Sequence, residues 1–127
     1  MKYAWIFDTP AVAGHAAGTS RRIRAGLRLI ADDPDFRLTI PVVCLIEAYP
    51  VTPPAAHHIL DSLAVNPGVL VEHIGTDPHT VVAVGHLAAG IGRAGAAHAA
   101  HLARAGDRPA IVFTDAILPV EVMTRPV

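Results

Sequence analysis

Three carboxylates lie in apolar stretches of the sequence, where a charged side chain is unexpected. Asp8 closes the run YAWIFD, Asp115 closes AIVFTD, and Glu47 is the single acid inside VVCLIEAY. Removing a carboxylate from water is costly unless a partner or a metal ion compensates for the lost hydration. Clustered carboxylates suit hard cations such as Mg²⁺ or Mn²⁺, which can clamp a phosphodiester and activate water.

The two aspartates end apolar runs that are typical of buried strands. In parallel α/β sheets, ligand chemistry collects at the carboxyl ends of the strands, where loops and helix N-termini converge. We therefore expect Asp8 and Asp115 to lie at the rim of such a sheet. Aspartate is also a preferred helix N-cap, so a structural role as caps is the alternative for both residues.

Strand and helix patterns alternate along the chain. Apolar and β-branched runs predict strands in YAWIFD, FRLTI, VLVEHI and AIVFTD, with an edge strand in LPVEVM. Helices are predicted after a Thr9-Pro10 cap, from Thr19 up to Pro34, through VVCLIEAY, after a Thr52 cap, from Asp77-Pro78 onward, and from Ala94 to Ala105. This alternation predicts one α/β domain over residues 1–127, with a mostly parallel central sheet covered by helices.

Composition bounds the class of protein. A chain of 127 residues, just over half of them apolar, can bury one core but is too short for two ordinary domains. A formal charge of −1 creates no general attraction to nucleic acid or membranes, so any polyanion site must be local. Cys44, alone in an apolar run, is typical of a buried hydrophobic residue. The N-terminal apolar segment is shorter than a signal-peptide core or a membrane span, so a soluble cytoplasmic protein is expected.

The order of these features resembles the PIN-domain family across nearly the whole chain. The motifs are IFDTPAV on the first strand, VVCLIEAY after the second, GAAHAAHLA on the penultimate helix and IVFTD on the strand after it. The resemblance implies a PIN-like three-layer α/β/α fold and a compact ribonuclease that depends on Mg²⁺ or Mn²⁺. Many members of the family are the toxin half of bacterial toxin–antitoxin pairs. RNA as the substrate, a homodimer and an antitoxin partner are therefore implied as well.

Carried over to this chain, the family motifs assign the catalytic and metal-binding acids. Thr9 matches the hydroxyl residue that often follows the first acid. Phe113 stands where a threonine is common, and Thr114 is the candidate to take over its hydrogen bonding. The acids assigned both as catalytic residues and as metal ligands are Asp8, Glu47 and Asp115.

One acid of the family is missing. It normally opens the penultimate helix four residues before a pair of small residues, and with Ala99-Ala100 as that pair its place falls on Gly95. Losing one carboxylate of four lowers the negative charge and the number of oxygen ligands. Catalysis by three acids with one ion, rescue by another side chain, and a fold that binds without catalysis all stay open. The candidates for rescue are His98, on the same helix face, and Asp77; His98 as a ligand favours Mn²⁺ or Zn²⁺.

An arginine-rich segment, RRIRAGLR, is a candidate contact for phosphates. Four arginines within two helical turns can meet several phosphate groups, and the alternative is a solvated helix face next to the acidic ADDPD. The other histidines lack metal-ligand spacing, and no dinucleotide, P-loop or GxSxG motif stands at a strand-to-helix turn. The candidate RNA contacts are Arg21, Arg22, Arg24 and Arg28.

Three functions follow from these observations. The first is a divalent-metal-dependent endoribonuclease of the toxin type, weakened by the loss of one acid. The second, motivated by Gly95, is a catalytically inactive PIN-like module that binds a protein partner or RNA. The third is a structural or regulatory α/β domain unrelated to this family, which a structure without convergence of the three acids would favour.

Overall fold

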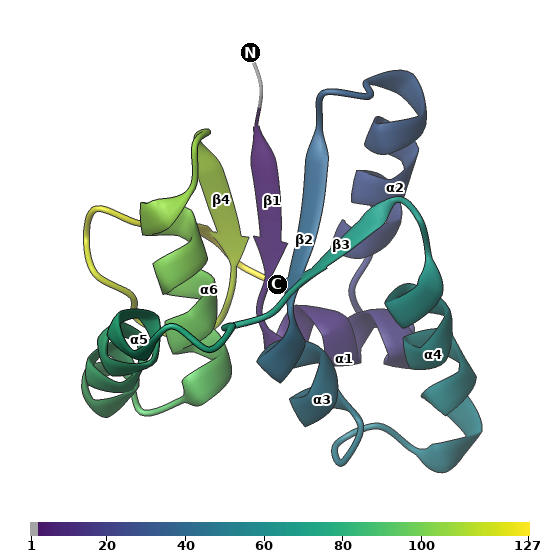
Figure 1. The fold of residues 1–127 in the computed structure, drawn as a ribbon. Helices are drawn as coiled ribbons and strands as arrows, with labels where there is room; N and C mark the ends of the chain where they lie inside the picture. The colour runs from purple at the N-terminus through teal and green to yellow at the C-terminus, as the bar shows by residue number, and fades with distance from the viewer. Residues whose placement is uncertain (1–2) are drawn as a thin grey trace.

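A fully parallel sheet forms the centre of the protein (Figure 1). The computed structural model describes residues 3–127. The strands are β1 (Ala4–Phe7), β2 (Arg37–Pro41), β3 (Val69–Glu72), β4 (Ala110–Phe113) and β5 (Met123–Arg125). They lie in the order β3-β2-β1-β4-β5, and every neighbouring pair is parallel. The first strand of the chain is therefore the central one. The edge strand β5 follows the predicted LPVEVM segment instead of coinciding with it, and the two share only Met123.

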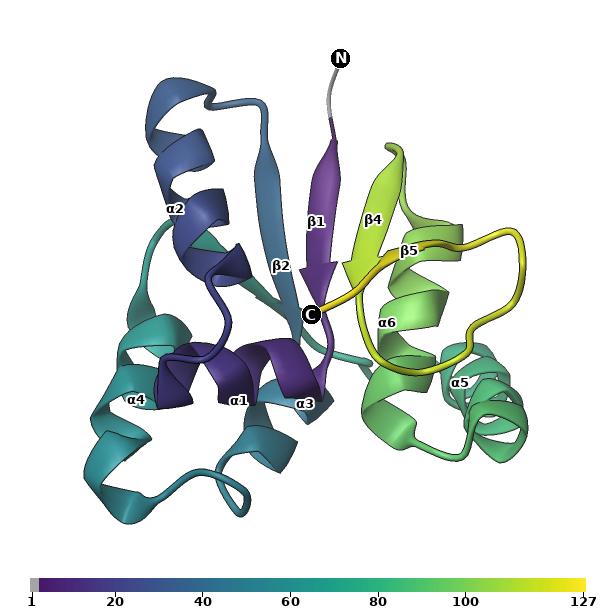
Figure 2. The ribbon, with the colours of Figure 1, turned by 180° about the vertical axis from the view of Figure 1, so that it is seen from behind.

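Helices cover both faces of this sheet. They are α1 (Thr9–Ala17), α2 (Arg22–Asp32), α3 (Val42–Ala48), the 3₁₀ turn η1 (Pro54–Ala56), α4 (His57–Val65), α5 (Pro78–Ile91) and α6 (Ala94–Ala105). Figures 1 and 2 show α5 and α6 on one side of the sheet and α1 and α2 on the other. This α/β/α arrangement confirms the predicted fold class. None of the helices in residues 3–127 has both the length and the apolar character to cross a membrane.

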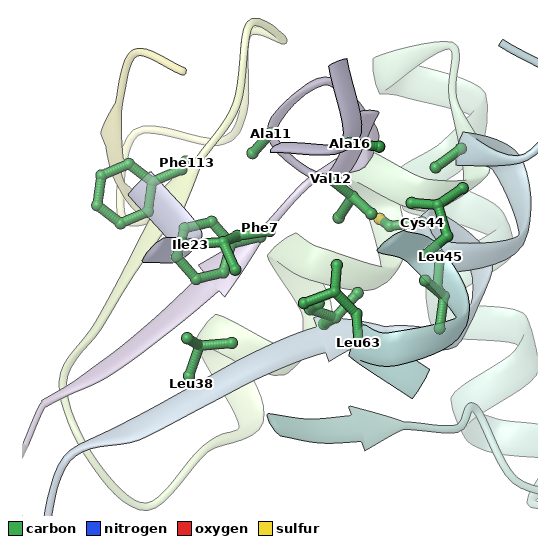
Figure 3. Close-up of a cluster of buried hydrophobic side chains, with 13 residues drawn as sticks. Phe7, Ala11, Val12, Ala16, Ile23, Leu38, Cys44, Leu45, Leu63 and Phe113 are labelled. Atoms are coloured by element: carbon green, nitrogen blue, oxygen red, sulfur yellow. The ribbon is translucent and has the colours of Figure 1, made fainter. Parts of the chain in front are cut away.

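Alternation along the strands divides the core into two parts. Phe7 and Phe113 stack with their ring centroids 5.1 Å apart, and Ile23 of α2 packs into the same cluster (Figure 3). Ile6 and Val112 belong to a second cluster, which they share with alanines of α6. Because successive side chains of a strand point to opposite faces, a strand buried on both faces is apolar throughout. Asp8, which directly follows β1, is therefore an exception to the apolar pattern of this strand.

Small residues bring α6 close to the sheet and to α3. Residues 95–100 of α6, with the sequence GAAHAA, are all buried. Alanine is the best helix former, and its single methyl group permits close approach between elements. The N-terminal end of α6 packs against α3, which places Gly95 beside Glu47.

Three helix starts differ from the predicted caps. Asp8, not Thr9, is the N-cap of α1, and its carboxylate accepts a hydrogen bond from the backbone N–H of Thr9 at 2.7 Å. The helix predicted from Thr19 begins at Arg22, and its N-cap residue makes no capping bond through its side chain. Thr52 donates at 2.7 Å to a carbonyl in the last turn of α3, so it closes that helix instead of capping the next. Short polar side chains can bond backbone groups on either side, so their type alone does not fix which helix end they serve.

Two helical glycines provide a matched test of this packing. A methyl group at buried Gly26 of α2 would stand 2.7 Å from Leu38 Cδ1 in the core, whereas one at Gly85 of α5 meets nothing within 4 Å. We expect Gly26→Ala to lower the free energy of unfolding by about 1–3 kcal/mol through overpacking. Gly85→Ala should raise it by about 0.5–1 kcal/mol, because alanine stabilises a helix interior. Urea unfolding followed by circular dichroism measures both, and effects of the same sign would contradict the packing of α2.

Candidate functional site

The three predicted acids gather at one edge of the sheet. Asp8 follows β1, Asp115 lies two residues beyond β4, and Glu47 is in the last turn of α3. Because β1 and β4 are adjacent and parallel, their carboxyl ends meet, with α3 and the start of α6 nearby (Figure 1). The acids share neighbours: Asp8 and Asp115 both contact Arg93, and Thr9 bonds Glu47.

Asp8 is fully buried, and both of its oxygens are engaged. Its Oδ1 accepts from the backbone N–H of Thr9 at 2.7 Å and from the thiol of Cys44 at 3.6 Å. Its Oδ2 accepts from the hydroxyl of Thr114 at 2.6 Å and from the guanidinium of Arg93. A carboxylate with no exposed surface is stable only with such compensation. The predicted accessory roles of Thr9 and Thr114 thus coincide with direct contacts in the cluster.

Arg93 belongs to the cluster although no sequence motif indicated it. One of its terminal nitrogens contacts Asp8 Oδ2, and the other lies 2.9 Å from Asp115 Oδ1. Gly92, with φ of 92°, ends α5, and Arg93 follows in extended conformation as the residue before α6. The signal was present in the chain: a lone cation stands two positions before Gly95, where the missing acid belongs.

Glu47 occupies the space that a side chain at Gly95 would need. A Cβ atom at Gly95 would overlap Glu47 Oε1 and would stand 2.9 Å from Thr9 Oγ1 and 3.0 Å from Cys44 Sγ. The hydroxyl of Thr9 donates to the same Glu47 oxygen at 3.1 Å. Gly95 therefore does face the carboxylate cluster, at the position inferred for the missing acid, and the acid from α3 fills the gap.

Cys44 contributes to the cluster as a neutral thiol. The residue is fully buried, as the sequence predicted. Burial, followed by the charge of Asp8, raises the pKa of the thiol far above its usual range. Since the thiolate is the nucleophilic form of cysteine, Cys44 acts here as a weak donor to Asp8 and not as a nucleophile.

In residues 3–127, the other candidate residues form no hydrogen bond or ion pair with the three acids. His98 is 1% exposed, and neither ring nitrogen has a hydrogen-bond partner in the described part of the chain. Burial lowers its pKa to about 4, and His101 and His73 add to this effect. Asp77 caps α5 by accepting from the backbone N–H of His79 at 3.0 Å. The arginines of the α2 segment, Arg21, Arg22, Arg24 and Arg28, are all exposed.

A divalent ion does not fit the cluster in this arrangement. Mg²⁺ requires near-octahedral oxygen ligands, and Mn²⁺ prefers similar oxygen sites. The oxygens of Asp8 are already bonded to four donors, one of them a cation. Within residues 3–127, no three side chains of the His, Cys, Asp or Glu type are placed to hold a metal ion. Metal binding by Asp8, Glu47 and Asp115 remains a prediction.

The cluster is a set of carboxylates partly neutralised by the partly exposed guanidinium of Arg93. Its oxygen atoms accept hydrogen bonds from neutral donors and from this one cation. Comparison of the chain with protein-family models, with curated proteins and with solved structures finds no match. The function is therefore inferred from the residues of the chain.

A side chain at Gly95 competes with Glu47 for one space. We expect Gly95→Ala to lower the free energy of unfolding by about 1–3 kcal/mol, because the new methyl group overlaps the Glu47 carboxylate. In a Glu47→Ala background the same change should cost markedly less, since the obstructing group is gone. A double-mutant cycle from urea unfolding measures the coupling. Strictly additive effects would show that Glu47 does not fill this space.

The buried imidazole of His98 makes stability depend on pH. Its pKa is about 4 in the folded protein, against an ordinary value of 6.5, so below pH 6.5 the unfolded chain binds the proton more readily. The stability present above pH 6.5 is lost as the pH falls toward 4, with a full loss of about 3 kcal/mol below both values.

We expect His98→Leu to remove this loss, because leucine is apolar and leaves no unpaired ring nitrogen. Urea unfolding is measured at neutral pH and near the folded pKa. The free energy of unfolding of the variant, relative to that of the wild type, should rise as the pH falls. His86→Gln, at an exposed position of α5, is the control and should leave the pH profile unchanged. Parallel profiles for His98→Leu and wild type would contradict the neutral, buried state of His98.

Proposed function

We propose that this protein is a PIN-like RNA-binding module that does not hydrolyse the RNA it binds. The order of Asp8, Glu47 and Asp115 along the chain and their convergence at one sheet edge support the family resemblance. One observation carries the absence of hydrolysis: Arg93 lies on Asp8 and Asp115, where a catalytic cation would have to bind.

The exposed arginines of the α2 segment support RNA as the ligand. Arg21 is the N-cap residue of α2, and Arg24 and Arg28 follow it at spacings of three and four residues, so the three lie on one side of the helix. Arg22 points elsewhere, with its guanidinium 5.4 Å from the ring centroid of Phe113. None of the four forms an ion pair with an acid in the described residues. Unpaired guanidinium groups bind phosphates well, and releasing counterions from a nucleic acid favours the complex.

A metal-dependent ribonuclease is the second candidate. The convergence of three acids with two threonine hydroxyls favours it, since these groups would surround a phosphodiester-cleaving centre if Arg93 moved away. A toxin role, an antitoxin partner and a homodimer follow from the family resemblance alone, and a cytoplasmic location follows from the sequence alone. All four remain predictions.

Binding of a labelled single-stranded RNA, measured by fluorescence anisotropy in EDTA, tests the proposed function. We expect Arg24→Ala/Arg28→Ala to weaken binding about tenfold and to lower the salt slope by about 1.4, because two phosphate contacts to a single strand are lost. Arg104→Ala is the control, since this exposed arginine pairs with Glu121 away from α2. Binding that is absent in the wild type, or equal in all three proteins, would contradict the proposal. Cleavage of the RNA in Mn²⁺ that Asp8→Asn abolishes would favour the ribonuclease instead.

A further inference from the structure

We infer that Arg93 is a built-in counterion that replaces a divalent ion between Asp8 and Asp115, and that its removal turns the cluster into a divalent-cation site. The inference deepens the proposed function and rests on it, because it names the residue that keeps the site from hydrolysis. It concerns the acids at the sheet edge and is independent of the arginines of α2.

The position of the guanidinium supports this role. Its two terminal nitrogens reach carboxylates at the ends of two adjacent strands, with Asp115 at 2.9 Å and Asp8 in direct contact. A planar guanidinium presents several donors in a fixed fork, so one side chain can bridge two carboxylates. A metal ion bridging the same two acids would have to occupy the same place.

The electrostatics of Asp8 require a cation at this place. Three of the donors to Asp8 are neutral: the backbone N–H of Thr9, the hydroxyl of Thr114 and the thiol of Cys44. Arg93 supplies the one positive charge in direct contact with this buried carboxylate among the described residues. A buried charge whose partner is removed is strongly destabilising.

The backbone holds Arg93 in position. Gly92 ends α5 in the left-handed conformation, with φ of 92°, and its N–H bonds to the carbonyl of Ala88 at 2.7 Å. The carbonyl of Arg93 then accepts from the backbone N–H of Ala97 at 3.1 Å, in the first turn of α6. The bridging side chain therefore starts from a short connection fixed on both sides.

The charge balance of the cluster is consistent with this replacement. With glycine at position 95, the cluster holds three carboxylates, and Glu47 turns into the vacant space to bond Thr9. Fewer carboxylates attract divalent ions less strongly, so a single guanidinium can compete for the place. Removing that guanidinium leaves Asp8 and Asp115 without their counterion and opens one acceptor position on Asp8 Oδ2 and one on Asp115 Oδ1.

Manganese binding and thermal unfolding of the full chain test the inference. Wild type, Arg93→Ala and Arg93→Ala/Asp8→Asn are compared by calorimetric titration with MnCl₂ and by melting in EDTA or in Mn²⁺. We expect no saturable Mn²⁺ binding by wild type. Arg93→Ala should melt about 10 °C lower in EDTA, because Asp8 has lost its counterion, and should bind Mn²⁺ and recover its melting temperature in it.

Two controls separate charge compensation from other effects. The double variant should melt above Arg93→Ala in EDTA, since the uncompensated charge is gone, and should bind no Mn²⁺. Sodium chloride at matched ionic strength should not restore Arg93→Ala. If Arg93→Ala does not fold, Arg93→Gln, which keeps a hydrogen-bond donor for Asp8, takes its place in the titration.

Equal Mn²⁺ affinity of wild type and the folded Arg93 variant would overturn the inference, and so would a folded variant that binds no Mn²⁺. Neither result bears on RNA binding in EDTA, which depends on α2. Failure of this inference and failure of RNA binding are therefore distinguishable.

Discussion

The burial of one carboxylate governs this structure. Asp8 sits at the end of the central strand with no exposed surface, and a charge in that place must be balanced from several directions. The donors come from the start of α1, from α3, from the segment after β4 and from the α5–α6 connection. The same bonds that satisfy Asp8 also join these elements at one sheet edge. The bonds that compensate the charge of Asp8 therefore also fix how these elements are arranged around it.

Positions 93 and 95 change the chemistry of that edge together. Glycine at 95 removes a side chain and lets Glu47 fold against α6, while arginine at 93 adds a cation between Asp8 and Asp115. With glycine at 95 but no arginine at 93, Asp8 would lack the cation that contacts it. Together the two residues produce a cluster in which the side chains form hydrogen bonds and ion pairs with one another.

Much of the fold could be predicted from local patterns. α6 runs from Ala94 to Ala105 as expected, because an alanine-rich stretch between glycine-containing breaks has few other conformations open to it. The position of Gly95 was inferred from the family resemblance, which places an acid four residues before the pair Ala99-Ala100. Arg93 was missed because its partners lie far along the chain, and a cation after a glycine break is ordinarily solvated. The burial of His98 was equally hidden, since its place on α6 does not reveal which neighbouring element covers it.

The order of the elements along the chain also determines when Asp8, at the end of the central strand, can meet its partners. β1 lies between β2 and β4, and Arg93 and Thr114 stand 85 and 106 positions after Asp8. During synthesis, Asp8 therefore emerges long before its counterion and its second hydroxyl donor exist. Until then it must stay hydrated, which opposes early burial of the strand end. The contacts of Asp8 with Arg93 and Thr114 can form only after β4 is available. Once they have formed, nearly the whole chain has folded.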